Sequence, residues 1–193
     1  MVNTQRQGIT SADRLYPGQL MFLNHFHTPA QGYKNSGHGI SVNSKVGGRS
    51  YGGRCIAVCG ATGYIMVECQ TSFSTASTVE AIKEFEQHAL DHRVVIKSYQ
   101  SDNGSAFTSK LFKQRLLDTN KDSRFSAAGS HHQNGKAERA IRTIMAMART
   151  MMLHAALHWD EASNPTWWPQ AVRHAVFIYY RIPKVDKDVQ PGD

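Results

Sequence analysis

Two acidic residues, Asp102 and Glu138, constrain the fold of this chain most, and 35 residues (103–137) lie between them. Asp102 follows a strand-like segment, 94–101. Glu138 lies near the start of a long helical segment, 133–158. A carboxylate at the end of a strand is a common ligand in α/β sheets, and one in the first turns of a helix can reach the same point. Two such groups can share a hard cation such as Mg²⁺.

The surrounding segments predict an α/β fold. Apolar and β-branched segments predict strands over 19–27, 54–60, 64–70, 94–101 and 124–126. Apolar residues spaced three or four apart predict helices over 74–92, 106–119, 133–158 and 166–181. This order indicates a mixed sheet with an antiparallel start and a parallel continuation.

The length of 193 residues suits one domain. We expect one folded domain to cover residues 19–183. An irregular lead-in, 1–18, ends at the turn pair Pro17-Gly18. A linker-like tail covers 184–193, and the segment 28–53, rich in Gly, Ser, Asn and Lys, predicts a long loop.

Two motifs contain the acids: SDNGSAF at 101–107 and HHQNGKAER at 131–139. With their spacing and the Arg142 that follows, they resemble the DDE catalytic core of retroviral-type integrases, most of all the copia type of LTR retrotransposons. The resemblance covers roughly residues 17–183. It implies an RNase H-like fold, a mixed five-stranded sheet flanked by helices. It also implies DNA integration by polynucleotidyl transfer with Mg²⁺ or Mn²⁺, retroelement ends and target DNA as partners, and a homodimer.

The chain departs from this family at the first acid. The family places that Asp in the first strand, and the matching position in the segment 17–26 is Asn24. An amide oxygen can coordinate a metal but brings no negative charge. The resemblance therefore implies catalytic and metal-binding positions at Asp102, Glu138 and Asn24, with weakened metal binding and impaired catalysis.

Basic residues on the 133–158 segment favour a nucleic-acid partner. The net charge is +7 and the isoelectric point is near 9.5, which is a broad indication of a polyanionic partner. On a helix, Glu138, Arg142, Met145 and Arg149 share one stripe. We expect Arg142 and Arg149 to bind DNA phosphates beside the metal site. The other residues predicted to contact DNA are Arg139, Lys136, Gln133 and Asn134.

Structural alternatives stand beside these roles. Asp102 could accept a hydrogen bond in an Asx turn, and Glu138 could pair with Arg142 one helical turn away. The two arginines could equally form a solvated helix face. Zinc is disfavoured because the His and Cys spacings do not match known zinc motifs. The candidates for zinc were His25, His27, Cys55 and Cys59.

Packing is the expected role of the tryptophans Trp159, Trp167 and Trp168, rather than stacking on bases. The three cysteines argue against a disulfide framework and suit a reducing compartment. The sequence has no apolar run of roughly 18 residues and no apolar signal-peptide core. These features predict a nuclear or cytoplasmic protein that does not span a membrane.

Three functions remain open from the sequence. The first is an integrase core that acts on DNA. The second is a DNA- or protein-binding module that keeps the fold without chemistry, as in a degraded or repurposed retroelement. Another RNase H-like nuclease is the third, and the two motifs disfavour it. Asn24 is the residue that distinguishes the active core from the binding module.

Overall fold

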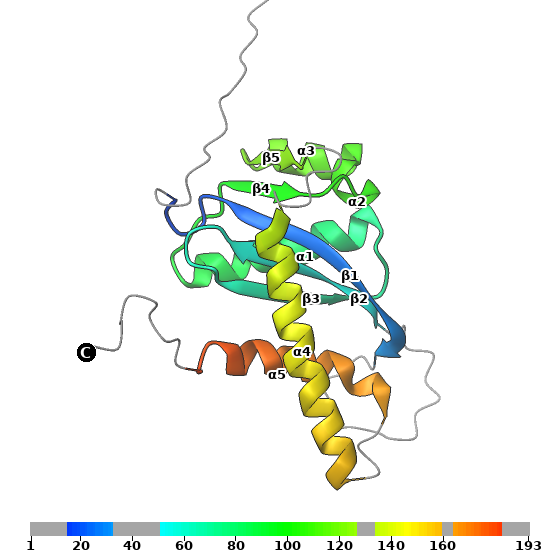
Figure 1. Ribbon diagram of the computed structural model, residues 1–193. Coiled ribbons are helices and arrows are strands. Elements are labelled where there is room, and N and C mark those ends of the chain that lie inside the picture. The colour runs from blue at the N-terminus through cyan, green and yellow to red at the C-terminus, as the bar shows by residue number, and fades with distance from the viewer. Residues whose placement is uncertain (1–14, 33–50, 127–133, 160–163, 183–193) are drawn as a thin grey trace, which may run out of the picture.

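The computed structural model describes residues 15–32, 51–126, 134–159 and 164–182 (Figure 1). The strands within these ranges are β1 (Met21–Gly32), β2 (Tyr51–Cys59), β3 (Ile65–Gln70), β4 (Ser98–Ser101) and β5 (Asp122–Phe125). The helices are α1 (Thr75–Asp91), α2 (Ser105–Thr108), α3 (Lys110–Asp118), α4 (Gly135–His158) and α5 (Trp168–Tyr179), with the short 3-10 helix η4 (Pro165–Trp167) before α5.

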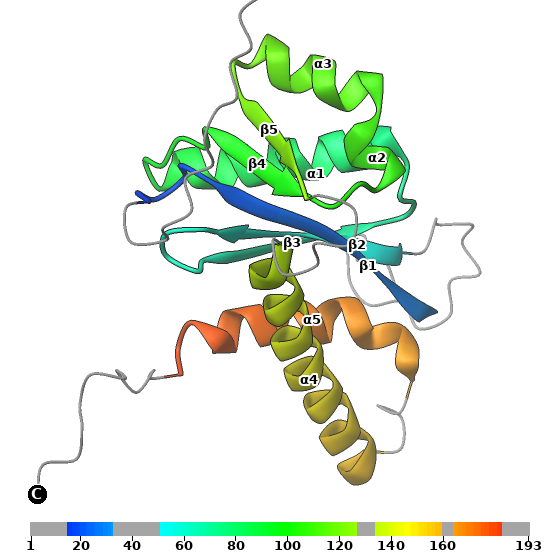
Figure 2. The ribbon, with the colours of Figure 1, turned by 45° about the horizontal axis from the view of Figure 1, so that its top comes forward.

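The five strands form one mixed sheet in the order β3-β2-β1-β4-β5. The pairs β1–β2 and β2–β3 are antiparallel, whereas β1–β4 and β4–β5 are parallel. Figure 2 shows α1, α2 and α3 on one face of the sheet and α4 and α5 on the other. The predicted α/β class and the antiparallel-to-parallel order are therefore confirmed.

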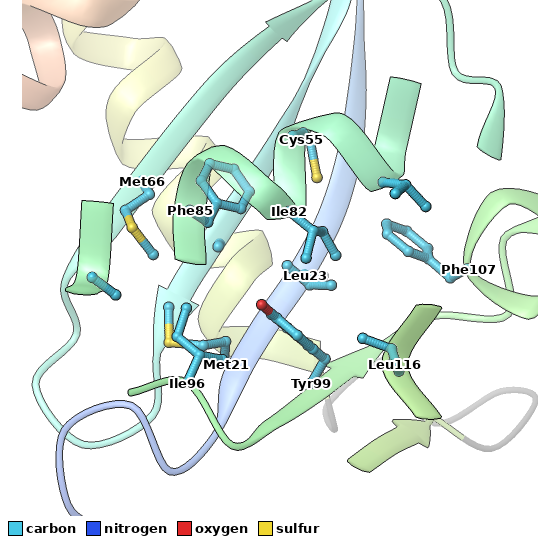
Figure 3. Close-up of a cluster of buried hydrophobic side chains, with 14 of the residues drawn as sticks. Met21, Leu23, Cys55, Met66, Ile82, Phe85, Ile96, Tyr99, Phe107 and Leu116 are labelled. Carbon is cyan, nitrogen blue, oxygen red and sulfur yellow. The ribbon is translucent and has the colours of Figure 1, made fainter. Parts of the chain in front are cut away.

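The sheet separates two hydrophobic cores. The first lies between the sheet and α1, α2 and α3, and Figure 3 labels ten of its buried side chains, Tyr99 among them. The second lies between the sheet and the helices α4 and α5, with Ile144 and Val172 fully buried. Each face of the sheet is thus covered, as expected for a layered α/β domain.

Side chains of β1 alternate between the two cores because successive residues of a strand point to opposite faces. Met21 and Leu23 lie in the first core, and Phe22 and Phe26 pack against the second. Asn24 therefore belongs to the face of the sheet that α4 covers.

The predicted loop 28–53 is in part a strand. β1 continues from the predicted end at 27 to Gly32, which pairs with Tyr51 after a register shift. A side chain at Gly32 would collide with Trp168 and Pro169, so this position needs glycine. Residues 33–50 lie outside the described part of the chain.

Two other predicted elements differ at their boundaries. β4 covers only the second half of the predicted strand 94–101, because Val94 donates its amide to Ala89 and Lys97 donates to Gly18 instead of pairing in the sheet. The predicted helix 106–119 divides at Ser109, whose backbone is extended. The Ser109 hydroxyl accepts a hydrogen bond from the amide of Phe112 and so caps α3.

A charged network ties α1 to the β4–β5 side of the sheet. Glu86 of α1 accepts hydrogen bonds from Arg115 Nη2 at 2.8 Å and from Tyr99 Oη at 3.0 Å. Lys121 Nζ lies 3.4 Å from the same carboxylate. The side chain of Glu86 is only 12% exposed, so three partners satisfy one largely buried charge.

Arg54 of β2 joins the sheet to α4 and α5. Its guanidinium carbon lies 3.8 Å from the centre of the Trp168 ring and 4.6 Å from that of Phe26. Nη1 donates to the sulfur of Met145, whereas Nε and Nη2 are buried without a partner. Burial lowers the pKa of Arg54 to about 10. Stacking on aromatic rings therefore holds this cation in the second core.

Candidate functional site

The register of the sheet places Asn24 near the end of β4, the strand that Asp102 follows. β1 and β4 are parallel, and Phe22 pairs with Gln100. Two residues beyond this pair, Asn24 continues β1 on the face that α4 covers, whereas Asp102 follows Ser101, the last residue of β4. Asn24 is half-buried and Asp102 is exposed.

Asp102 lies in the turn that leads from β4 to α2. Its Oδ1 accepts a hydrogen bond of 3.0 Å from the amide of Gly104, which is the Asx-turn geometry considered from the sequence. Asn103 Nδ2 donates to the carbonyl oxygen of Ser126 and anchors the turn to the end of β5. Asp102 Oδ2 accepts no hydrogen bond from the described residues, so a ligand can still use this carboxylate.

The start of α4 is attached to β1 directly next to Asn24. Asn134, which precedes α4, is 2% exposed and donates from Nδ2 to the carbonyl oxygen of Leu23 at 2.9 Å. Glu138 lies in the first turn of α4 and is half-buried. The attachment thus fixes the start of α4, whose first turn contains Glu138, to β1.

Two residues predicted to contact DNA have a role within the fold. Asn134 is the first, and it forms no side-chain cap on its own helix. Lys136 is the second: its Nζ donates to the carbonyl oxygen of Gly60 and lies 5.8 Å from the centre of the Phe22 ring. No local signal in the sequence indicates either link, because the acceptors Leu23 and Gly60 lie far from α4 in the chain. DNA contact by either residue stays a prediction.

The remaining basic residues of α4 are open to solvent. Arg139, Arg142 and Arg149 are exposed. The predicted stripe is interrupted at Met145, whose sulfur faces inward to Arg54. No ion pair links Glu138 to Arg142 within the part of the chain that the structure describes. Gln133, the other predicted contact, lies outside the described residues.

The residues considered for zinc serve packing. The ring of His25 stacks on Phe107 with 4.4 Å between centroids, and that of His27 lies 4.0 Å from Phe73. Cys55 is fully buried, and burial raises the pKa of its thiol. Among the described residues, no three His, Cys, Asp or Glu side chains form a group able to hold a metal. With Asn24 in place of Asp, the candidate site contributes only two residues of these types.

Burial of His25 makes the stability of the protein depend on pH. Burial lowers the pKa of His25 from 6.5 to about 4, while the charge of Asp102 opposes this shift. Between these values the unfolded chain binds more protons, so stability is complete above pH 6.5 and is lost as the pH falls toward 4. We expect a loss of about 2–3 kcal/mol in metal-free buffer, measured by urea unfolding.

The variant His25→Phe keeps an aromatic ring against Phe107 and cannot titrate, so most of this loss should disappear. The matched control is His174→Phe, at an exposed position of α5. An unchanged pH dependence in His25→Phe would contradict this prediction.

The tryptophans differ in their surroundings. Trp168 is buried in the second core and Trp167 is half-buried, as predicted. The prediction for Trp159 is wrong, because this residue is 56% exposed. Figure 2 shows that the last turn of α4 lies away from the sheet, and Leu157 is exposed there as well. No helix within the described ranges is both long and apolar enough to cross a membrane.

Comparison with known proteins finds one partial relative in sequence. No family model matches the chain. Over 101 residues the chain is 32% identical to the retrovirus-related Pol polyprotein from transposon TNT 1-94 of Nicotiana tabacum. The aligned stretch is 51% of this chain and 7% of the polyprotein, so the chain spans only a small part of that relative.

Solved structures match nearly the whole chain. The magnesium-bound integrase catalytic core domain of HTLV-2, in a trimeric form, matches with a TM-score of 0.60 and 17% identity, over 90% of this chain and 92% of that one. The simian T-cell lymphotropic virus intasome in complex with PP2A regulatory subunit B56 gamma matches with a TM-score of 0.64 and 14% identity, over 89% of this chain and 51% of that one. The predicted RNase H-like fold is confirmed, and together the findings support the predicted integrase-like core, copia type included.

Proposed function

We propose that this chain, a retroelement protein with an integrase-like catalytic core, binds DNA along the outer face of α4 and has impaired polynucleotidyl transferase activity. The observation that carries the proposal is the position of Asn24, near the end of the strand that Asp102 follows and next to the attached start of α4. The resemblance implies catalytic acids at Asn24, Asp102 and Glu138, and the side chain of Asn24 carries no charge.

The donor set suits a hard divalent cation. Asn24, Asp102 and Glu138 offer only oxygen ligands, which Mg²⁺ and Mn²⁺ prefer. Two carboxylates can neutralise one divalent cation, but they leave a second cation poorly compensated, so we expect weakened binding. Such a cation would polarise a phosphoryl oxygen and lower the pKa of a bound water. Within the chain, the fixed charges of Asp102 and Glu138 would favour its retention, while Asn24 would contribute a dipole.

DNA is the partner we propose for the exposed arginines. In a retroelement of the copia type the substrates would be retroelement ends and target DNA, met in the nucleus or the cytoplasm. A homodimer is also part of the proposal. It is supported by the solved HTLV-2 core, which has been described in a dimeric as well as a trimeric form.

DNA binding should depend on the arginines of α4. We expect the double variant Arg142→Ala with Arg149→Ala to weaken binding to duplexes of unrelated sequence to a similar extent. The slope of log Kd against log salt should fall by about 2, since each lost phosphate contact removes about one counterion. Fluorescence anisotropy over a series of salt concentrations measures both quantities.

The control for this experiment removes the same charge from the other side of the sheet. Lys83 of α1 and Lys110 of α3 are exposed, and both helices pack on the face opposite α4. The double variant Lys83→Ala with Lys110→Ala should keep the original salt slope. An equal effect of the two double variants would mean that α4 is not the binding face.

A second candidate function is a DNA- or protein-binding module without chemistry, derived from a degraded or repurposed retroelement. Asn24 is the observation that favours it. This function predicts DNA binding through α4 with no strand transfer, even after Asn24 has been replaced by Asp.

A further inference from the structure

A pair of histidines lies at the far end of α4, away from the site described above. His154 and His158 are one helical turn apart and both are exposed. Their ring centroids are 4.4 Å apart. Neither ring forms a hydrogen bond or an ion pair within the part of the chain that the structure describes. Both rings therefore keep nitrogen lone pairs that are open to solvent.

The position of this pair favours a cation. α4 continues beyond its last buried residue, Ala148, and runs clear of the sheet (Figure 2). His158 lies in the last turn, where the unpaired carbonyl groups give the helix end a partial negative charge. No lysine or arginine lies between Arg149 and the end of α4, so no cation on this stretch of the helix opposes the charge of a bound metal.

The spacing matches the requirements of a transition metal. Imidazole is a good ligand for Zn²⁺, Ni²⁺ and Cu²⁺, and two His residues four positions apart on a helix can bind one Zn²⁺. With Zn–N bonds of 2.0–2.1 Å and tetrahedral angles, the two nitrogens must lie roughly 3.3 Å apart. Rings with centroids 4.4 Å apart are close enough for their nitrogens to reach this distance through rotation about the side-chain bonds.

We propose that His154 and His158 form a two-ligand site for a divalent transition metal of the zinc class, with water in the remaining coordination positions. The site is separate from the carboxylates near Asn24 in both place and chemistry. It needs nitrogen ligands and therefore rejects Mg²⁺, which prefers oxygen. It does not depend on the proposed DNA function.

A second pair with the same spacing provides the control. His88 and His92 of α1 have ring centroids 4.6 Å apart. One nitrogen of each ring is already engaged, since His88 Nε2 shares a hydrogen bond with the hydroxyl of Tyr64 and His92 Nδ1 lies 2.8 Å from the carbonyl oxygen of His88. A metal bound by Nε2 of both rings would have to displace the hydroxyl of Tyr64.

The test is calorimetric titration of the full chain with ZnCl₂ at neutral pH, after treatment with chelator. We expect one site that is lost, or weakened at least about tenfold, in the double variant His154→Gln with His158→Gln. The double variant His88→Gln with His92→Gln should keep that site, and circular dichroism should show both variants folded. Titration with MgCl₂ should give the same result in the native protein and both variants.

Three results would overturn the proposal. These are no Zn²⁺ binding by the native chain, binding that survives the loss of His154 and His158, and an equal loss in both double variants. None of these results bears on the carboxylate site, because that site is tested with Mg²⁺ and with DNA. Failure of the DNA proposal would likewise leave the Zn²⁺ titration unchanged.

Discussion

Replacing Asn24 by Asp should raise the rate of strand transfer with Mg²⁺ by about 10²–10³-fold. The substitution adds a negative charge on the α4 face of β1, near the end of the strand that Asp102 follows. In such a site one well-placed group that stabilises developing charge is worth about 2.7–4 kcal/mol, which corresponds to this change in rate. Asp and Asn have nearly the same shape, so the half-buried position can accept the new side chain without repacking.

The measurement is a strand-transfer or disintegration assay with Mg²⁺ and with Mn²⁺ on the native protein and on Asn24→Asp. Asn120→Asp is the matched control, because it adds the same charge in the turn between α3 and β5, where Asp tolerates the observed φ of 52°. Adding Asp102→Asn to Asn24→Asp should abolish the gain. Robust activity of the native protein, unchanged by Asn24→Asp, would contradict the prediction.

The sheet and most helices were predictable because their signals are local. The spacing of apolar residues in α1 and α4 and the apolar composition of β2 and β3 each lie within a short window. The order of these elements then restricts the topology to a mixed sheet with few alternatives. The positions of Asp102 and Glu138 along the chain follow the same logic. Asp102 comes directly after β4, and Glu138 lies in the first turn of α4.

Element ends were not predictable, because contacts between distant segments decide them. The extension of β1 to Gly32 depends on pairing with Tyr51 and on close packing against Trp168. A segment rich in Gly and Ser is typical of a loop when these partners are unknown. The break at Ser109 depends on one hydroxyl that caps α3, although serine is also tolerated inside helices.

The roles of Asn134 and Lys136 were missed for a related reason. Their side chains bond the carbonyl oxygens of Leu23 and Gly60, which are 111 and 76 residues away in the chain. Polar residues beside a proposed DNA site are naturally assigned to the ligand when only the sequence is known. The structure shows that they also attach the start of α4, which contains Glu138, to β1 and to Gly60.

Replacing Glu86 by Ala should lower the free energy of unfolding by about 3–5 kcal/mol, the cost of leaving buried charges unpaired. Arg115 and Lys121 would lose their carboxylate, and the Tyr99 hydroxyl would lose its acceptor. The side chains of both cations are largely buried, at 21% and 13% exposure, so water can replace the carboxylate only in part. Since domains of this size are stable by about 5–15 kcal/mol, the variant would approach the limit of folding.

Glu80 supplies the control for this measurement by urea unfolding. It lies on the same helix and pairs with Lys83 at 2.8 Å. The side chain of Glu80 is 67% exposed and that of Lys83 is 49% exposed. An exposed pair contributes about 0–1 kcal/mol, so Glu80→Ala should have little effect. Glu86→Gln should fall between the two, because an amide oxygen can still accept from Tyr99 but carries no charge for the cations. Equal stability of Glu86→Ala and Glu80→Ala would show that the network does not hold α1 to the sheet.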